Sequence, residues 1–204
     1  MILSECLPRL GKELFEEIAN HSSNRTYSSQ EQIIKQGEII RFLPIVLSGS
    51  VKVYSQEEAI QFLLYYISSG ETCIFHFAHI FNDQPVEFSA VAEKESELIL
   101  LPIHKVQEWH NRYPRFNDVL LKAYQKHYNE LLHTTKQVIC YNLEDRLIDY
   151  LKKKSSLADS ELLAISHQDI ATDLGTSREV ITRLLKKPNV GEVAMQVGRK
   201  IKIR

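Results

Sequence analysis

Cysteine is scarce in this sequence, and its spacing limits the chemistry of the chain. The 204 residues include three cysteines, Cys6, Cys73 and Cys140, which lie far apart and form no Cys-x-x-Cys pair. This spacing excludes a disulfide framework and a cysteine-rich zinc site, and we expect three separate thiols.

Long apolar runs and catalytic motifs are also missing. No run approaches the roughly 20 residues that span a bilayer, and the first residues lack the basic region and apolar core of a signal peptide. We therefore expect a cytoplasmic protein without membrane contact. No nucleophile with a base and an orienting group is visible, nor is a Gly-rich phosphate loop, so we expect no enzyme. With 44% hydrophobic and 25% charged residues, the chain is an ordinary globular protein of one or two domains.

The most informative segment lies near the C-terminus and predicts two short helices around a tight turn. Ser166 and Asp169 form a Ser-x-x-acid pair that favours a helix start. Gly175 then ends this helix, because glycine tolerates the left-handed conformation common at helix ends. Thr176 followed by Glu179 predicts a second capping box at once. Two helices joined by so short a turn must cross steeply.

The second of these helices combines a buried stripe with a polar face. Apolar residues at helical spacing predict the stripe: Val180, Ile181, Leu184 and Leu185. The remaining residues face outward: Ser177, Arg178, Thr182, Arg183 and Lys186. Arginine can donate twice to guanine, a carboxylate can accept from cytosine, and hydroxyls can bind phosphates. The pattern predicts a helix that reads DNA, and the alternative is a solvated face on a helical hairpin.

The C-terminal tail supports the DNA interpretation. After Pro188 breaks the helix, Glu192–Val197 and Lys200–Arg204 alternate around Gly198-Arg199 and predict a β-hairpin wing. From Arg178 onward there are eight Lys or Arg against two Glu, a net charge of plus six. The whole chain carries minus one, so the rest carries minus seven. This asymmetry predicts a basic patch for phosphates at one end of an acidic protein.

The N-terminal half shows the pattern of one helix followed by short strands. Residues 5–22 show apolar residues at helical spacing. Between residues 26 and 103, short β-type runs are separated by turn residues, and strands at this spacing predict a sandwich or barrel. These runs are Ile39–Val46, Ser50–Tyr54, Gln61–Ile67 and Glu97–Pro102.

A long helix is predicted between the two halves. From Pro114 to about Val138 the sequence has no Gly and no further Pro. Six residues recur at alternating steps of three and four, the spacing of a coiled-coil seam: Leu121, Tyr124, Tyr128, Leu131, Thr135 and Val138. We expect a dimer helix; the alternative is a helix packed wholly on its own chain.

This order of parts resembles the Crp/Fnr superfamily of bacterial transcription regulators over nearly the whole chain. Ile33–Glu38 and Val46–Tyr54 resemble the family's early β-roll strands, Gly70-Glu71 resembles its phosphate-binding segment, and Ser177–Arg183 resembles its recognition helix. The fold class expected is α+β. It comprises a jelly-roll-like antiparallel β-roll with flanking helices (1–113), a dimerisation helix (114–140) and a winged helix-turn-helix (141–204).

The resemblance implies a homodimer that binds double-stranded DNA at a two-fold symmetric operator and contacts RNA polymerase. Arg178, Glu179 and Arg183 would contact base edges, as in members that share this spacing. The other residues expected on the DNA-binding face are Thr176, Ser177, Thr182, Lys186, Lys187, His167, Gln168, Arg199 and Lys200.

The effector site departs from the family pattern. Cyclic-nucleotide binders carry a second Gly-Glu after the first and an arginine that pairs with the cyclic phosphate. Here Gly70–Cys73 has no second Gly-Glu after it, and Phe88-Ser89-Ala90 stands where the arginine is expected. A buried phosphodiester without a cation is strongly disfavoured, so we expect no cyclic AMP binding. Three cysteines also cannot supply the four ligands of the family's iron-sulfur cluster.

The remaining effector residues leave alternatives open. The expected pocket residues are Gly70, Glu71, Thr72, Cys73, Phe88 and Ser89. Nearby aromatic residues either form a site for an unidentified apolar effector or fill the roll: Phe62, Tyr65, Tyr66, Phe75, Phe77, Phe81 and Phe88. Cys73 is either a redox switch or a buried structural thiol. The histidines His76, His79 and His104 do not predict a metal site. In a further alternative the β-roll binds no ligand and serves as a scaffold.

Overall fold

The structure is a computed structural model of the chain. It describes residues 10–57, 60–73, 79, 81, 84–198 and 200–204, and for residues 60 and 137–140 it describes the backbone alone. The chain divides into two compact units. One contains the described residues up to Gln56 together with Leu64–Leu131, and the other contains those of Glu57–Leu63 and Leu132–Arg204. Within the described part, no helix has the length and apolar character needed to cross a bilayer.

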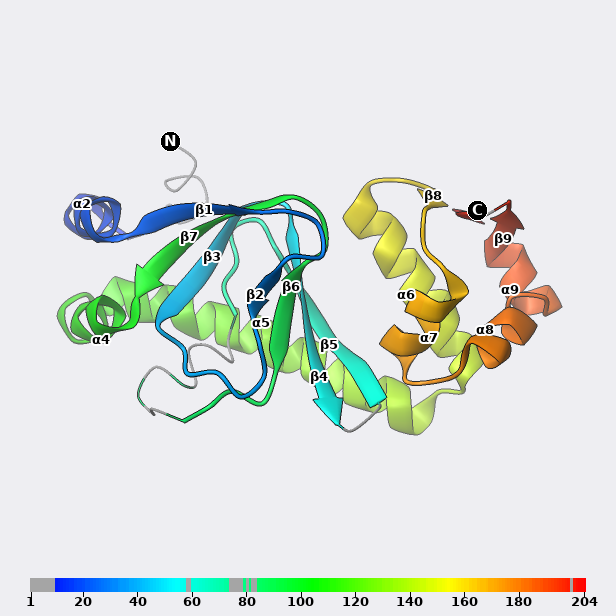
Figure 1. Cartoon of the computed structure of the whole chain (residues 1–204). Coiled ribbons are helices and arrows are strands. Elements are labelled where there is room, and N and C mark those ends of the chain that lie inside the picture. Colours follow the sequence, from blue (N-terminus) through cyan, green and yellow to red (C-terminus); the bar gives the residue numbers. More distant parts are fainter. Residues whose placement is uncertain (1–9, 58–59, 74–78, 80, 82–83, 199) are drawn as a thin grey trace. The chain divides into compact units, whose positions relative to one another are not determined.

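Two antiparallel sheets form the first unit (Figure 1). The first has the strand order β1–β7–β3, with β1 at Ser23–Tyr27, β3 at Phe42–Ser48 and β7 at Ser96–Pro102. The second has the order β2–β6–β4–β5, with the strands at Gln32–Ile34, Ser89–Ala92, Ser50–Glu57 and Ile60–Ser68. The two sheets share one buried cluster, so they face each other across a common core. The β-roll expected from the strand spacing is confirmed.

Strand β3 is buried on both of its faces. Its Val46 belongs to the core of the roll, whereas Leu43, Ile45 and Leu47 belong to a second cluster on the outer side. Successive side chains of a strand point to opposite faces, which produces this alternation. Burial on both sides is why the segment is an uninterrupted apolar run in the sequence.

Three helices complete the outer cluster. They are α2 (Lys12–His21), α4 (Ile103–Arg112) and the first turns of α5 (Pro114–Cys140), and they contribute Leu14, Trp109 and Phe116. The helix predicted for residues 5–22 therefore has its described part in α2, and residues before 10 lie outside the description. The long helix predicted from Pro114 is confirmed as α5.

The turn between β3 and β4 requires glycine. Gly49 has φ of 90°, a conformation that other residues rarely adopt, and a Cβ atom there would lie 2.6 Å from the backbone oxygen of Glu95. The backbone N–H of Ser50 donates to the Ser96 hydroxyl at 3.0 Å and ties this turn to the start of β7. This turn carries the chain from β3 of the first sheet to β4 of the second.

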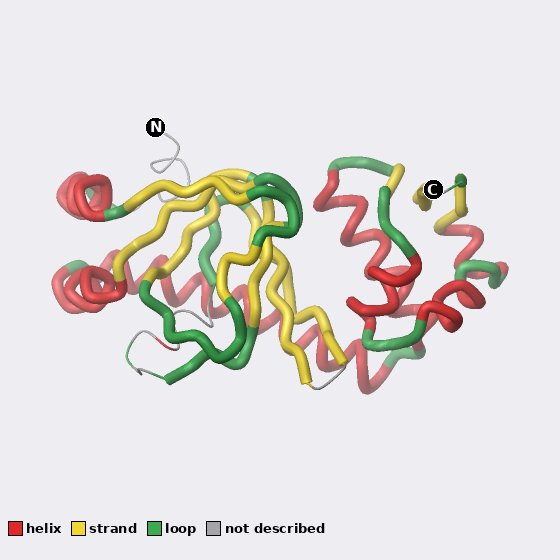
Figure 2. The backbone as a smooth tube through the Cα atoms, in the orientation of Figure 1, coloured by secondary structure: helices red, strands yellow, loops and turns green. Residues whose placement is uncertain are grey.

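The second unit is mainly helical and ends in a small sheet (Figure 2). Helix α6 (Leu143–Ala158) is followed by β8 (Leu162–Leu163), α7 (His167–Leu174) and α8 (Arg178–Leu184). Helix α9 (Pro188–Val193) then leads into β9 (Ala194–Val197) and β10 (Lys200–Ile203), and the sheet order is β8–β10–β9. One buried cluster joins these helices to the sheet, as in a winged helix-turn-helix.

The sequence-based boundaries need several corrections. The prediction missed β1, β6 and α4, and it placed the start of β3 three residues early. The strand-like segment Ile33–Glu38 overlaps β2 only at Ile33 and Ile34. Pro188 does not simply break a helix: it stands at the first position of α9, where its missing N–H and fixed φ suit a helix start. Helix α9 therefore takes Glu192 and Val193, and the wing hairpin begins only at Ala194.

Candidate DNA-binding face and effector site

Helix α7 has the start and the end that the sequence predicts. The Ser166 hydroxyl accepts from the backbone N–H of Asp169 at 3.1 Å, and the Asp169 carboxylate accepts from the backbone N–H of Ser166, also at 3.1 Å. Gly175 then adopts a left-handed conformation, with φ of 65° and ψ of 44°, and ends the helix. The first capping box and the glycine turn are therefore confirmed.

The cap of α8 differs from the prediction by one residue. Ser177 is the N-cap, and its hydroxyl accepts from the backbone N–H of Val180 at 3.4 Å. Thr176 still belongs to the turn, where its N–H donates to the carbonyl of Ala171 at 2.9 Å. The predicted capping box of Thr176 with Glu179 is wrong for this reason.

Polar contacts hold α7 on α6, and apolar packing joins α8 to the same cluster. Tyr150 donates to the Asp173 carboxylate at 2.8 Å, and both side chains are buried. Arg146 donates to the carbonyl of Leu174 at 3.0 Å. Of the predicted stripe, Ile181 and Leu184 are buried, while Val180 and Leu185 are partly buried. The helix-turn-helix is thus anchored from inside and leaves its polar face free.

That polar face is continuous. A surface hollow of about 380 Å³ is lined by Arg178, Glu179, Thr182, Arg183 and Lys186. All of these except Thr182 are exposed, and they combine three cations with one carboxylate. This grouping offers donors for guanine and for phosphate together with an acceptor for cytosine.

The carboxylate of this face is held in its ionised form. Its own backbone N–H and the Ser177 hydroxyl bond the Glu179 side chain and lower its pKa below the ordinary value. Arg178 lowers it further by its charge. A carboxylate that stays ionised is an acceptor only, which suits an amino group on a base edge.

Two residues of the predicted face have partners within the unit. The Thr182 hydroxyl donates to the carbonyl of Arg178 at 2.8 Å and lies 2.9 Å from His167 Nδ1. Since the hydroxyl hydrogen is already used, His167 Nδ1 is the donor in the second bond. Burial lowers the pKa of His167 below its ordinary value, and the nearby Arg178 lowers it further. His167 and Thr182 therefore link α7 to α8.

The remaining predicted residues are spread more widely. Lys187 pairs with Glu144 at the start of α6, at 2.6 Å, and this bond lowers the pKa of the Glu144 carboxyl. Gln168 is exposed and donates to the Thr172 hydroxyl at 3.5 Å. Lys200 is exposed at the start of β10, and Arg199 lies outside the described residues.

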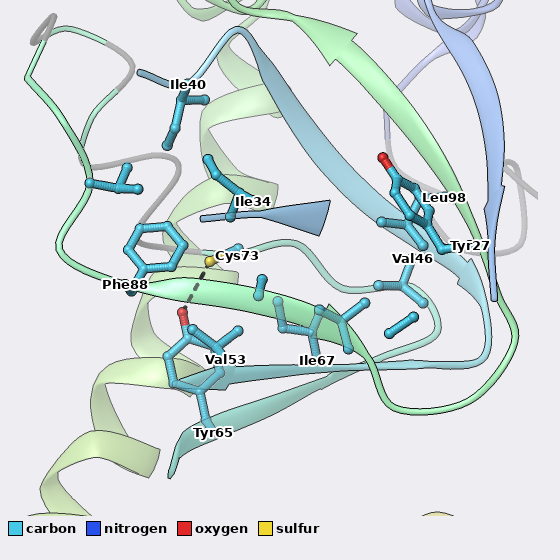
Figure 3. Packing of buried hydrophobic residues seen from close by; sticks show 14 residues of the cluster. Tyr27, Ile34, Ile40, Val46, Val53, Tyr65, Ile67, Cys73, Phe88 and Leu98 are labelled. Atoms are coloured by element: carbon cyan, nitrogen blue, oxygen red, sulfur yellow. Dashed lines mark hydrogen bonds between the residues drawn. The ribbon is translucent and has the colours of Figure 1, made fainter. Parts of the chain in front are cut away.

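The interior of the β-roll is filled by side chains, as Figure 3 shows. Phe88, at the position where an arginine is expected, is buried beside Cys73. The Cys73 thiol is fully buried and lies 3.3 Å from the hydroxyl of Tyr65. The Ser89 hydroxyl accepts from the backbone N–H of Gln36 at 3.0 Å, so it too has a structural role.

The aromatic residues expected near the effector do not form one pocket. Tyr65, Tyr66 and Phe88 are buried, whereas Phe62 is 39% and Phe81 54% exposed. Phe75 and Phe77 lie outside the described residues, as does His76. His79 is partly buried and His104 is exposed, and no group of three metal-ligating side chains occurs among the residues described.

The segment at Gly70 is tied to α5. Glu71 forms an ion pair with Lys126, and the buried His127 lies with Nε2 3.0 Å from the carbonyl of Thr72. His127 Nδ1 lies 2.9 Å from the Glu130 carboxylate, and its ring stacks on Tyr65 at 4.4 Å between centroids. The prediction missed His127, because a single histidine on a helix carries no signal of partners 55 residues away.

The predicted dimer seam is largely exposed on the first turns of α5. Leu121 is 61% and Tyr128 49% exposed, and Tyr124 stacks on Tyr128. Leu131 instead packs partly against the roll core, and its neighbour Leu132 is exposed. Thr135 is exposed, and the side chain of Val138 lies outside the description.

Comparison with known proteins agrees with both units. Residues 24–113 match the family model of the cyclic nucleotide-binding domain, and residues 163–187 match that of bacterial regulatory proteins of the crp family. No curated protein matches the chain.

Solved structures share the fold. A putative transcriptional regulator of the crp/fnr family from Eubacterium rectale has a TM-score of 0.84 at 22% identity, covering 95% of this chain and 90% of that one. The c-di-GMP responsive global regulator CLP from Xanthomonas campestris has a TM-score of 0.81 at 21% identity, covering 94% of this chain and 98% of that one. The chain therefore carries a cyclic nucleotide-binding-type domain and a crp-type helix-turn-helix, and it shares the fold of Crp/Fnr-family transcription regulators.

Proposed function

We propose that the protein is a sequence-specific DNA-binding regulator in which α8 enters the major groove. The observation that carries this proposal is the shared exposed face of Arg178, Glu179 and Arg183, presented by a helix whose other side is buried. Bidentate donation from arginine to guanine and acceptance by glutamate from cytosine would read bases there. The two arginines are five residues apart, so they would reach neighbouring base pairs.

Phosphate contacts would surround these base contacts. Lys186, in the turn after α8, and Lys200, on the wing, are exposed cations. Gln168, Thr176 and Ser177 offer polar groups near the helix starts. We assign Arg199 the same role from its place in the wing sequence. Three residues of the predicted face have partners within the unit: His167, Thr182 and Lys187. We propose that they hold the recognition helix in place and lie at the edge of the DNA-binding face.

The regulator would act as a homodimer. The exposed stripe of Leu121, Tyr124 and Tyr128 on α5 favours a helix pair, because large apolar side chains in a row are poorly placed in water. We therefore keep residues 114–140 as the dimer helix between domains at 1–113 and 141–204. Two recognition helices related by a two-fold axis imply half-sites with centres about 10 base pairs apart.

The control of this regulator would not depend on cyclic AMP. The interior of the roll is occupied by Tyr65, Phe88 and Cys73, and no cation stands at the position of Phe88. The full burial of Cys73 favours a structural thiol over a redox switch. The β-roll would then serve as the dimer scaffold and as a surface for RNA polymerase.

Substitution of Arg178 tests the reading role. We expect Arg178→Ala to weaken operator binding by about 1 to 3 kcal/mol per half-site and to relax base preference at one position. Lys200→Ala is the matched control, because loss of a phosphate contact should weaken all sequences alike. The measurement is fluorescence anisotropy with the operator and with single-base variants of it. If Arg178→Ala bound the operator as tightly and as selectively as the parent, the assignment of the reader would be wrong.

Substitution in the exposed stripe tests the dimer. We expect Leu121→Glu combined with Tyr128→Glu to shift the protein from dimer to monomer and to remove tight operator binding, because each monomer would hold one half-site. The control is Lys136→Glu, which places a glutamate at an exposed position of the same helix outside the stripe. Sedimentation velocity measures the state, and a monomeric parent would contradict the proposal.

A further inference from the structure

The first unit holds a cavity outside the core of the roll. It has a volume of about 610 Å³ and lies between β3, the segment 70–72 and one flank of α5. Its apolar wall includes Leu43 and Ile45 of β3, which face away from the core side occupied by Val46. Small-molecule sites in proteins commonly have volumes of about 300 to 1,000 Å³, so the cavity is large enough for a compact organic ligand.

The wall contributed by α5 is also apolar. Phe116, Val119, Leu120 and Ala123 line it. Phe116 and Leu120 are already buried, whereas Val119 and Ala123 are partly exposed, and a ligand there would cover their apolar surface. Unlike the interior of the roll, this space is not filled by aromatic side chains of the core. The cavity is therefore a second candidate for an effector site.

The rim of this cavity is charged with an excess of cations. Arg115, Lys122 and Lys126 stand against Glu71 and Asp118. Lys126 is paired with Glu71, whereas Arg115 and Lys122 are exposed and have no ion-pair partner among the residues described. An anionic group would gain charge-assisted hydrogen bonds there without displacing an existing pair.

The cavity would stay accessible in the proposed dimer. At 100° per residue, the cationic positions 115, 122 and 126 lie about 150° around α5 from the exposed stripe at 121, 124 and 128. A partner helix on the stripe would thus leave the cavity flank uncovered. The same helix presents one flank to the second protomer and the other to the cavity.

We propose that this cavity binds a small monoanion with an apolar body, such as a medium-chain carboxylate, as the effector of the regulator. The apolar body would lie on the partly exposed Val119 and Ala123, and the anionic group would lie at Arg115 and Lys122. An anion that also reaches Lys126 would compete with Glu71 for this cation. The residue after Glu71, Thr72, is hydrogen-bonded through its carbonyl to His127 of α5. Ligand binding would in this way act on α5, and this regulatory part rests on the proposed function.

The experiment titrates the full chain with octanoate by isothermal calorimetry and compares octanamide, an uncharged ligand of similar size. We expect octanoate to bind about tenfold or more tightly than octanamide, the difference that one charge-assisted hydrogen bond supplies. Arg115→Gln with Lys122→Gln should remove this preference, whereas Lys136→Gln, a cation elsewhere on α5, should keep it. Equal binding of the two ligands, or no binding of octanoate, would overturn the anion site.

A second variant tests the location of the site. Ala123→Phe should fill the cavity and abolish binding of both ligands, and its thermal melting curve, compared with that of the parent, shows whether a loss comes from misfolding. Operator binding without ligand is measured separately by anisotropy. If the parent binds its operator but not octanoate, the cavity proposal fails alone; if it binds octanoate but no DNA, the proposed function fails alone.

Discussion

The outward face of α8 and the interior of the β-roll have diverged to different degrees from the pattern of the superfamily. On α8, the Arg-Glu-x-x-x-Arg spacing is intact, and its side chains are exposed together. In the roll, Phe88 stands where the resemblance places the phosphate arginine, and it is buried in a packed core. The proposed reading face thus keeps the superfamily's pattern, whereas the expected phosphate position is part of the core.

The largest expected effect on this contrast comes from a substitution that creates a cavity inside the roll. We expect Phe88→Ala to lower the free energy of unfolding by about 3 to 5 kcal/mol, because it leaves a cavity among buried side chains. The measurement is urea denaturation followed by circular dichroism. Phe81→Ala is the control: its side chain is 54% exposed, and its loss should cost about 1 kcal/mol or less. A loss at Phe88 as small as that at Phe81 would mean that the interior is not packed.

A smaller effect distinguishes residues that stabilise α8 from residues that would contact bases. We expect Thr182→Val to lower the free energy of unfolding by about 1 kcal/mol, because it removes the hydroxyl shared by Arg178 and His167. The base preference in operator binding should stay that of the parent. Ser177→Ala, which removes the cap of the same helix, provides a comparison of similar size. A change of base preference in Thr182→Val without loss of stability would show that Thr182 contacts a base and does not stabilise the helix.

The smallest effect concerns pH. The pKa of His167 lies below its unfolded value of about 6.5, because burial and Arg178 disfavour the charged ring. Between the folded and unfolded pKa values the unfolded chain binds more protons, so this stabilising contribution is complete above about pH 6.5 and is lost as the pH falls through the folded pKa.

Paired melting curves check this prediction. The parent should lose more thermal stability between pH 7.5 and pH 5.5 than His167→Gln, and the difference isolates His167 from the other histidines. Equal losses in the two proteins would show that His167 is not held in its neutral form.

Local signals explain which parts of the fold were predictable. The capping box at Ser166, the glycine at 175 and the stripe of α8 depend on residues within one turn, and all are visible in the sequence. Strand β1 was missed because four of its five residues are exposed and polar, and β6 because it is a short run of small residues. Pro188 was interpreted as a breaker although it equally suits the first position of a helix.

Long-range contacts explain what was not predictable at the candidate sites. Glu144 and Lys187 are 43 residues apart, and His127 and Thr72 are 55 apart. Nothing in the spacing of these residues predicts that they meet. The sequence therefore predicted the side chains of the proposed reading face but could not tell which of them already have partners.

The pair of Lys187 with Glu144 affects how the protein would respond to ionic strength. Each cation that neutralises a DNA phosphate releases condensed counterions, and the slope of log affinity against log salt counts these cations. Lys187 is already paired with the Glu144 carboxylate, at 2.6 Å. A count of the basic residues between Arg178 and the C-terminus therefore overstates the number of counterions released. We expect Glu144→Gln to steepen that slope by about one unit by freeing Lys187 for a phosphate.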